Sequence, residues 1–195
     1  MSPADYLVHL VLSVFLIVGG YQFYFWCQRH PLTAPREFPL AVDSWIPYRP
    51  GWVWIYSCLY YPAILYTNWI VNSPRQFTHL VTSYLILLAF QMVFFLAFPV
   101  RTPETWRTQN TQRTWSERFL ALVQRFDDRS NSFPSMHTSV AMLTALHLYP
   151  RLGPWALLFP VVIGLSCLFT KQHYVLDVPA GAALGWGVFR AFQVI

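Results

Sequence analysis

Charged residues are scarce in this chain. Only 11% of its 195 residues are Asp, Glu, Lys or Arg, against roughly 25% in an ordinary soluble domain, whereas 55% are hydrophobic and 18% aromatic. Cysteine is scarce too, with only Cys27, Cys58 and Cys167. Because they are odd in number and widely spaced, they indicate neither a disulfide framework nor a zinc motif. The composition therefore argues against a soluble enzyme.

The few charges are clumped, and the gaps between the clumps are long. A helix needs about 20 mainly apolar residues to cross a bilayer. Five uncharged stretches reach that length; they lie between Asp5 and Arg29, Arg49 and Arg75, Arg75 and Arg101, Arg129 and Arg151, and Arg151 and Lys171. A sixth, after Asp177, is shorter, but Arg190 near its end can snorkel to the interface.

We therefore predict an all-α polytopic membrane protein, with one integral membrane domain over residues 1–195. The expected spans are residues 6–27, 51–71, 79–100, 133–149, 154–170 and 176–194. The first span lacks a basic n-region and a small-residue cleavage site, so we expect a retained helix rather than a signal peptide. Between the third and fourth spans, Thr114-Trp115-Ser116-Glu117 has the form of a capping box and predicts a short interfacial helix.

One polar segment opens the fourth span. It reads Ser132-Phe133-Pro134-Ser135-Met136-His137-Thr138-Ser139. Because proline is tolerated in the first turn of a helix, Ser132 is the expected N-cap. Hydroxyls and a histidine at a helix N-terminus favour an anion site, although the same residues can simply satisfy backbone groups.

A second polar segment joins the fifth and sixth spans and carries His173 and Asp177. Residues four apart share a face of a helix, so the carboxylate is expected to orient the imidazole, as in a nucleophile-activating triad. A helix staple or a pair of metal ligands would have the same spacing. An even number of spans separates this segment from His137, so both segments belong at one membrane face.

Phe133-Pro134-Ser135-Met136-His137 followed by His173-Tyr174-Val175-Leu176-Asp177, in a six-span chain, resembles the type 2 phosphatidic acid phosphatase (PAP2) superfamily. That superfamily includes lipid phosphate phosphatases, glucose-6-phosphatase-like enzymes, and the related sphingomyelin and inositol phosphorylceramide synthases. The resemblance covers residues 98–187. It implies that His173 is the nucleophile, Asp177 its orienting carboxylate, His137 the general acid and Ser135 a phosphate ligand.

The resemblance is imperfect where the family binds phosphate. The phosphatases place an Arg six residues before the nucleophile, and here that residue is Cys167. Lys171, one helical turn further on, is a candidate for the missing charge. The family's first motif is also absent in its usual form, so Arg101 is the first candidate for the phosphate clamp, with Arg107 and then Arg129 as weaker ones. These departures lean toward the synthase-like branch.

Three functions follow from these patterns. The leading hypothesis is a metal-independent phosphatase that acts on a lipid phosphate through a phosphohistidine. The alternatives are a phosphotransferase of the inositol phosphorylceramide or sphingomyelin synthase type, and a non-catalytic membrane protein that binds anionic lipid. No cofactor, metal or nucleic acid is expected; lipid phosphate and membrane lipids are the expected partners, and the sequence gives no indication of the oligomeric state.

The face of the membrane that carries the site is given conflicting signals. Ten of the 13 basic residues would lie on the catalytic side, which by the positive-inside rule favours the cytoplasm. The enzymes that the chain resembles mostly face away from the cytoplasm. We expect an extracytoplasmic or lumenal site.

Overall fold

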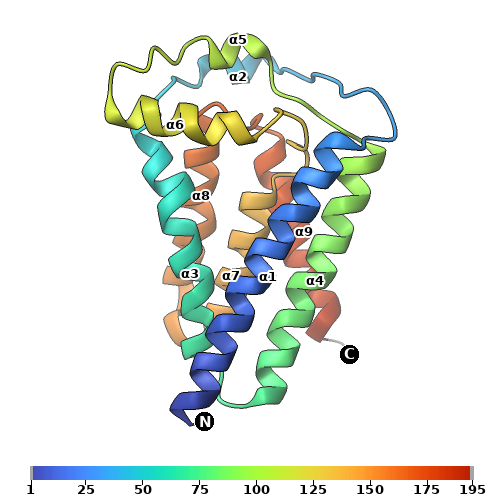
Figure 1. Cartoon of the computed structure of the whole chain (residues 1–195), viewed down its shortest axis with the longest axis vertical. Helices are drawn as coiled ribbons and strands as arrows, with labels where there is room; N and C mark the ends of the chain where they lie inside the picture. Colours follow the sequence, from blue (N-terminus) through green and yellow to red (C-terminus); the bar gives the residue numbers. More distant parts are fainter. Residues whose placement is uncertain (1, 194–195) are drawn as a thin grey trace.

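The computed structural model describes residues 2–193, and within them the regular structure is helical apart from one isolated bridge between Arg36 and Val100. The longer helices run along the long axis of the molecule (Figure 1). Three short helices and the two long loops cover one end, which we call the capped end. The all-α class predicted from the sequence is confirmed.

All six ranges predicted as spans are mainly helical. In chain order the long segments are α1 (Pro3–Arg29); η1 (Pro50–Trp52), η2 (Ile55–Leu59, a π-helical turn), α3 (Tyr60–Tyr66) and η3 (Thr67–Trp69); α4 (Pro74–Ala97); α7 (Met136–Leu152); η4 (Gly153–Leu157) with α8 (Leu158–Phe169); and α9 (Asp177–Gln193). The short helices of the capped end are α2 (Ala41–Trp45), α5 (Glu104–Arg107) and α6 (Trp115–Phe126).

Within residues 2–193, three segments are long and apolar enough to cross a membrane: Pro3–Arg29, Pro74–Ala97 and Met136–Phe169. Large apolar side chains lie exposed on their outer faces, for example Phe15, Val93 and Val161. Such an apolar exterior is typical of a protein surrounded by lipid. The number of crossings stays a prediction.

Local sequence fixes where the helices begin and turn. Ser73 caps α4 by accepting a hydrogen bond from the Gln76 amide, and Pro74 takes the first position, so α4 starts five residues before the predicted span. At Gly153 the backbone adopts φ 58°, which glycine tolerates, and the chain turns there between α7 and α8. Thr114 and Glu117 form the predicted capping box at the start of α6.

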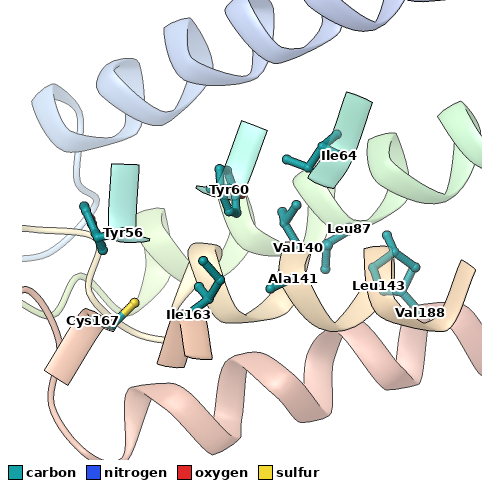
Figure 2. Close-up of a cluster of buried hydrophobic side chains, with 10 residues drawn as sticks. All are labelled: Tyr56, Tyr60, Ile64, Leu87, Val140, Ala141, Leu143, Ile163, Cys167 and Val188. Carbon is teal, nitrogen blue, oxygen red and sulfur yellow. The ribbon is translucent and has the colours of Figure 1, made fainter. Parts of the chain in front are cut away.

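The core lies around α7. A buried cluster joins η2, α3, α4, α8 and α9 to this helix (Figure 2), and its members are Tyr56, Tyr60, Ile64, Leu87, Val140, Ala141, Leu143, Ile163, Cys167 and Val188. Helix α9 packs so close to α7 that a Cβ added at Gly181 would overlap the backbone oxygen of Ser135, and one at Gly185 that of Ser139. The two glycines therefore permit the contact that positions the two histidine motifs.

Candidate active site

His173 lies in the turn between α8 and α9, and its ring is held by two acceptors. Nδ1 is 2.9 Å from the backbone oxygen of Ser132 and 3.3 Å from Oδ2 of Asp177. A carbonyl oxygen can only accept, so Nδ1 carries the proton of the neutral ring. The lone pair is therefore on Nε2, which is the nitrogen that can act as a nucleophile.

Asp177 is the first residue of α9, and its Oδ2 also accepts from the Tyr174 amide at 2.9 Å. The expectation that His173 and Asp177 share one face of a helix is wrong. Residues 170–176 form turns, and the chain bends back so that the Asp177 amide donates to the Tyr174 carbonyl at 3.1 Å. The pair meets through this turn instead.

His137 lies in the first turn of α7, across from His173. The centroids of the two rings are 6.2 Å apart. The His137 ring stacks on Tyr56 with a centroid separation of 4.1 Å and contacts Tyr60 at 4.9 Å. Two aromatic side chains thus fix the plane of one imidazole opposite the other.

Ser135, and not Ser132, is the N-cap of α7. Its Oγ accepts from the amide of Thr138 at 3.3 Å and from the Thr138 hydroxyl at 3.1 Å, and the residue has no exposed surface. The expected start of the helix was therefore wrong, because Pro134 precedes the cap rather than following it. Ser135 spans the two motifs, since its amide donates to the Asp177 carbonyl at 3.0 Å. The Ser135 oxygen accepts both of these bonds, so its own proton is not used in them, and its role as a phosphate ligand stays a prediction.

We expected Lys171 to lie one helical turn after Cys167 on the same helix. It lies instead beyond the end of α8, with φ 58°, and does not share a helix face with Cys167. Its Nζ donates to the backbone oxygen of Asp43 at 2.8 Å and lies 5.0 Å from the centroid of the Trp106 ring. Burial lowers the pKa of Lys171, and the Asp43 carboxylate opposes that change. The Asp43 carboxylate in turn accepts from the Val175 amide at 2.7 Å. Lys171 and Asp43 thus fasten the first loop onto the His173 turn.

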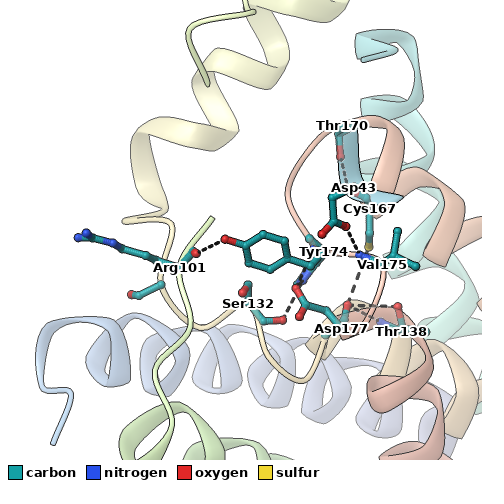
Figure 3. A network of polar contacts seen from close by, with 12 residues as sticks. Asp43, Arg101, Ser132, Thr138, Cys167, Thr170, Tyr174, Val175 and Asp177 are labelled. Atoms are coloured by element: carbon teal, nitrogen blue, oxygen red, sulfur yellow. Dashed lines mark hydrogen bonds and ion pairs between the residues drawn. The ribbon is translucent and has the colours of Figure 1, made fainter. Parts of the chain in front are cut away.

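Arg101 is turned away from the histidines. Its guanidinium pairs with Glu37 at 3.3 Å and is about half exposed, and Figure 3 shows it pointing away from Ser132 and Asp177. Only its backbone meets the motif, where the Tyr174 hydroxyl donates to the Arg101 carbonyl at 2.8 Å. Arg129 pairs with Glu104 at 3.7 Å.

Of the three candidate arginines Arg101, Arg107 and Arg129, Arg107 has buried N–H groups without a hydrogen-bond partner among the described residues. Its Nη1 donates to the Gln124 carbonyl at 2.9 Å, and its Nη2 lies 3.5 Å from Oδ2 of Asp127. Nε and Nη2 are buried and make no hydrogen bond in the part of the chain that the structure describes. Burial raises the pKa of Asp127, while Arg107, then Gln28, and also His173 oppose the rise. The Asp127 carboxylate therefore interacts electrostatically with both Arg107 and His173.

A cavity of about 370 Å³ opens beside His137, between α1, the η2–α3 segment, α6 and α7. Aromatic side chains make up most of its lining, and the residues that line it are Tyr21, Tyr24, Phe25, Tyr56, Ser57, Tyr60, Tyr61, Phe119, Val123, Phe126, Asp127, Met136 and His137. A mainly apolar cavity with a few polar groups is typical of a ligand site. Residues 2–193 contain no group of three or more His, Cys, Asp or Glu side chains that can hold a metal ion.

Four residues near the site, Asp43, Asp127, Gln28 and Ser132, make contacts or offer a donor there that the sequence had not indicated. Asp43 lies in a proline-rich loop, and nothing in its sequence pattern links it to the His173 turn. Asp127 and Gln28 form a hydrogen bond between α1 and the loop after α6, a contact between distant parts of the chain that no spacing predicts. The unpartnered buried hydroxyl of Ser132 was visible only as part of the polar segment.

A family model described as the PAP2 superfamily matches residues 50–191. No curated protein and no solved structure matches the chain. The matched range runs from η1 into α9 and contains both histidine motifs, which the fold brings within 6.2 Å of each other. The chain belongs to the PAP2 superfamily, whose phosphatase-type chemistry agrees with a histidine held by a carboxylate and faced by a second histidine.

Proposed function

We propose that the chain is a membrane-embedded, metal-independent lipid phosphate phosphatase that acts through a phosphohistidine at His173. The observation that carries this proposal is the pair of acceptors at Nδ1, the Ser132 carbonyl and the Asp177 carboxylate. They keep the lone pair on Nε2 and stabilise the imidazolium that forms as Nε2 bonds to phosphorus.

In the first step, Nε2 of His173 attacks phosphorus and the bond from phosphorus to the leaving alkoxide oxygen breaks. His137 in its protonated form gives its proton to that oxygen, which leaves as an alcohol. In the second step, the oxygen of a water molecule attacks phosphorus while His137, now neutral, takes a proton from that water. The bond from phosphorus to Nε2 breaks, inorganic phosphate leaves, and both histidines return to their starting states.

Arg107 is the proposed phosphate clamp, in place of Arg101. Its buried Nε and Nη2 lack hydrogen-bond partners in the described structure, and buried donors of this kind are costly unless a ligand satisfies them. A guanidinium matches two phosphate oxygens at once. The buried Ser132 hydroxyl, next to the carbonyl that holds His173, is the proposed second donor.

The aromatic cavity beside His137 supports a lipid substrate. Its mainly aromatic lining suits an acyl chain, while the polar lining residues Asp127 and His137 suit the head of the molecule. The catalytic end is proposed to face outward or into a lumen. Arg101 and Arg129 each pair with a carboxylate, and Arg107 is the proposed phosphate clamp, so these three arginines have roles other than setting the orientation, which weakens the positive-inside count.

A phosphotransferase of the inositol phosphorylceramide or sphingomyelin synthase type is the second candidate. It is favoured by Cys167, a fully buried core residue where the phosphatases carry an arginine. The covalent step would be the same, and an alcohol would replace water in the second step. The two functions therefore differ in the acceptor.

The test is phosphate release from lipid phosphates by the purified full chain, with a chelator present and with lipid alcohols as competing acceptors. His173→Ala should lose turnover almost completely. His30→Ala is the matched control, since His30 is exposed and its ring contacts only its own helix. Transfer to an alcohol in preference to water would replace the phosphatase by the transferase. Normal turnover by His173→Ala would refute both.

A further inference from the structure

A second polar cleft lies at the end of the molecule opposite the capped end. It has a volume of about 680 Å³ and lies between the α3–α4 connection, the first turns of α4 and the end of α7. Figure 1 shows that connection far from α2, α5 and α6. We call it the basic cleft, because Arg75, Arg151, His79 and His147 line it, with Asn72 and Gln76 as further polar residues.

The positive charge of the basic cleft is unbalanced. In the described part of the chain no acidic residue lines the cleft, and neither Arg75 nor Arg151 forms an ion pair. Asp5, at the same end, is engaged with the amide of Ser2 at 2.7 Å in the capping box of α1. At the capped end, by contrast, three arginines have carboxylate partners.

The side chains of the basic cleft retain free donors. Arg151 makes one long contact, from Nη1 to the Trp69 carbonyl at 3.5 Å. His147 is fixed, since the Ser83 hydroxyl donates to the Leu80 carbonyl at 2.6 Å and so accepts from Nε2 of His147 at 2.9 Å. Two exposed guanidinium groups beside a fixed imidazole are suited to oxygens that carry negative charge.

The surroundings of the basic cleft resemble a membrane interface. Trp69 and Trp155, which flank it in sequence, are 63% and 76% exposed. Exposed tryptophans at the ends of apolar helices are typical of the headgroup level of a bilayer. An anion held here would lie in the leaflet opposite His173.

We propose that the basic cleft binds a phosphate-bearing anion, which Arg75 and Arg151 hold and which the catalytic site does not touch. The shared chemistry is a phosphate group, either on an anionic lipid or free in solution. This inference does not depend on the proposed enzymatic function, because it concerns a different end of the molecule.

The experiment uses the full chain in detergent and follows its thermal unfolding with added phosphatidylglycerol, phosphatidylcholine or inorganic phosphate. Phosphatidylglycerol is a phosphodiester and not a substrate for the proposed phosphatase. The test variant is Arg75→Gln with Arg151→Gln. The control is Arg113→Gln with Arg125→Gln, which removes the same charge from exposed positions at the capped end.

We expect phosphatidylglycerol to stabilise the wild-type chain and the control variant, and the test variant to bind it at least about tenfold more weakly. Stabilisation by phosphatidylglycerol alone identifies a lipid headgroup, and equal stabilisation by inorganic phosphate identifies a soluble anion. The proposal would be overturned if the test and control variants bound phosphatidylglycerol with equal affinity and also bound inorganic phosphate with equal affinity. Arg75→Lys with Arg151→Lys keeps the charge and checks that any loss is not a folding defect, since partial binding should return.

Discussion

His173, the proposed nucleophile, has two hydrogen-bond acceptors at Nδ1, and the shorter contact is to a backbone carbonyl. Asp177→Asn should therefore leave the Nδ1–H tautomer in place, because the Ser132 carbonyl still holds it. In a Ser-His-Asp triad the same change costs about 10⁴-fold in turnover, chiefly through the wrong tautomer. We expect a smaller loss here, measured as kcat for lipid phosphate hydrolysis. A loss as large as that of His173→Ala would show that the carbonyl does not hold the ring.

His137 should behave as a proton donor whose importance depends on the leaving group. His137→Ala is expected to lower turnover of an alkyl phosphate about 10²–10⁴-fold. With a nitrophenyl phosphate the first step needs little proton donation, so the variant should accumulate a phosphoenzyme whose breakdown lacks its base. If the phosphate of the substrate is radiolabelled, the phosphoenzyme should appear as label bound to the protein that is stable to alkali and lost in acid. The same loss for both leaving groups would contradict the role of general acid.

The sequence brought His137, His173 and Asp177 together, as the structure does, but it gave no sign that the Arg101 side chain turns away from them. His137, His173 and Asp177 belong to short motifs at the ends of helices. Because an even number of predicted spans separates the two motifs, the sequence predicted that both lie at the same face of the membrane. Arg101 was preferred over Arg107 because it stands next to the third span. Its partner Glu37 comes from the first loop, where the backbone pairs with residues 99–101, and such a long-range contact has no local signal.

Among the elements, the contact between α7 and α9 determines how the two motifs face each other. Gly181→Ala would push a methyl group into the backbone oxygen of Ser135, the residue that caps α7 and binds the Asp177 carbonyl. Overpacking of this kind costs about 1–3 kcal/mol. We expect a lower thermal unfolding midpoint together with reduced turnover.

Gly187→Ala is the matched control in the same helix, since nothing lies within 4 Å of the added Cβ. It should leave turnover unchanged, and as a helical Gly-to-Ala change it should stabilise α9 slightly. If Gly181→Ala and Gly187→Ala behaved alike, the close approach of α9 to α7 would be wrong.

The capping box of α6 should make the stability of the folded state depend on pH. Hydrogen bonds from the Thr114 amide first, and also from the Thr111 and Thr114 hydroxyls and the Arg113 amide, hold the pKa of Glu117 below its ordinary value of 4.5. A carboxyl whose pKa is lower in the folded state stabilises that state above its unfolded pKa, and the stabilisation is lost as the pH falls through the folded value.

Glu117→Gln should therefore lower the thermal unfolding midpoint at neutral pH, and the difference from wild type should shrink as the pH falls below about 4.5. Thermal scans from pH 7 to pH 3 measure this. Glu104→Gln is a control, because the Glu104 side chain is 80% exposed and has a distant partner in Arg129 at 3.7 Å. A constant difference at all pH values would mean that the Glu117 charge is not the cause.

Helix positions were easier to predict than helix ends. Long uncharged stretches located five of the six helical ranges, and the sixth was found only by allowing Arg190 to lie within it. The ends depend on single side-chain contacts, such as the Ser135 cap that moved the start of α7 to Met136. The break between α8 and α9 also defeated the helical spacing argument, because Thr170 to Leu176 form turns.

At the scale of the whole molecule, the two ends differ in charge and in form. The capped end holds the paired arginines, the histidine motifs and the aromatic cavity, and the other end holds the basic cleft. Six crossings would place these ends on opposite sides of a membrane. This arrangement can be tested with single cysteines in a Cys58→Ser background, because Cys58 is exposed whereas Cys27 and Cys167 are buried.

The last prediction is the labelling pattern of those cysteines by a membrane-impermeant maleimide in sealed vesicles. Thr33→Cys and Thr111→Cys, both exposed at the capped end, should react from one side. Ser2→Cys, Asn72→Cys and Trp155→Cys should react from the other, together with a tag after the last residue, because six is an even number of crossings. An odd number of crossings would place the tag on the side opposite Ser2→Cys. The side on which Thr111→Cys reacts is the side of the catalytic histidines, and we expect it to be the outer or lumenal one.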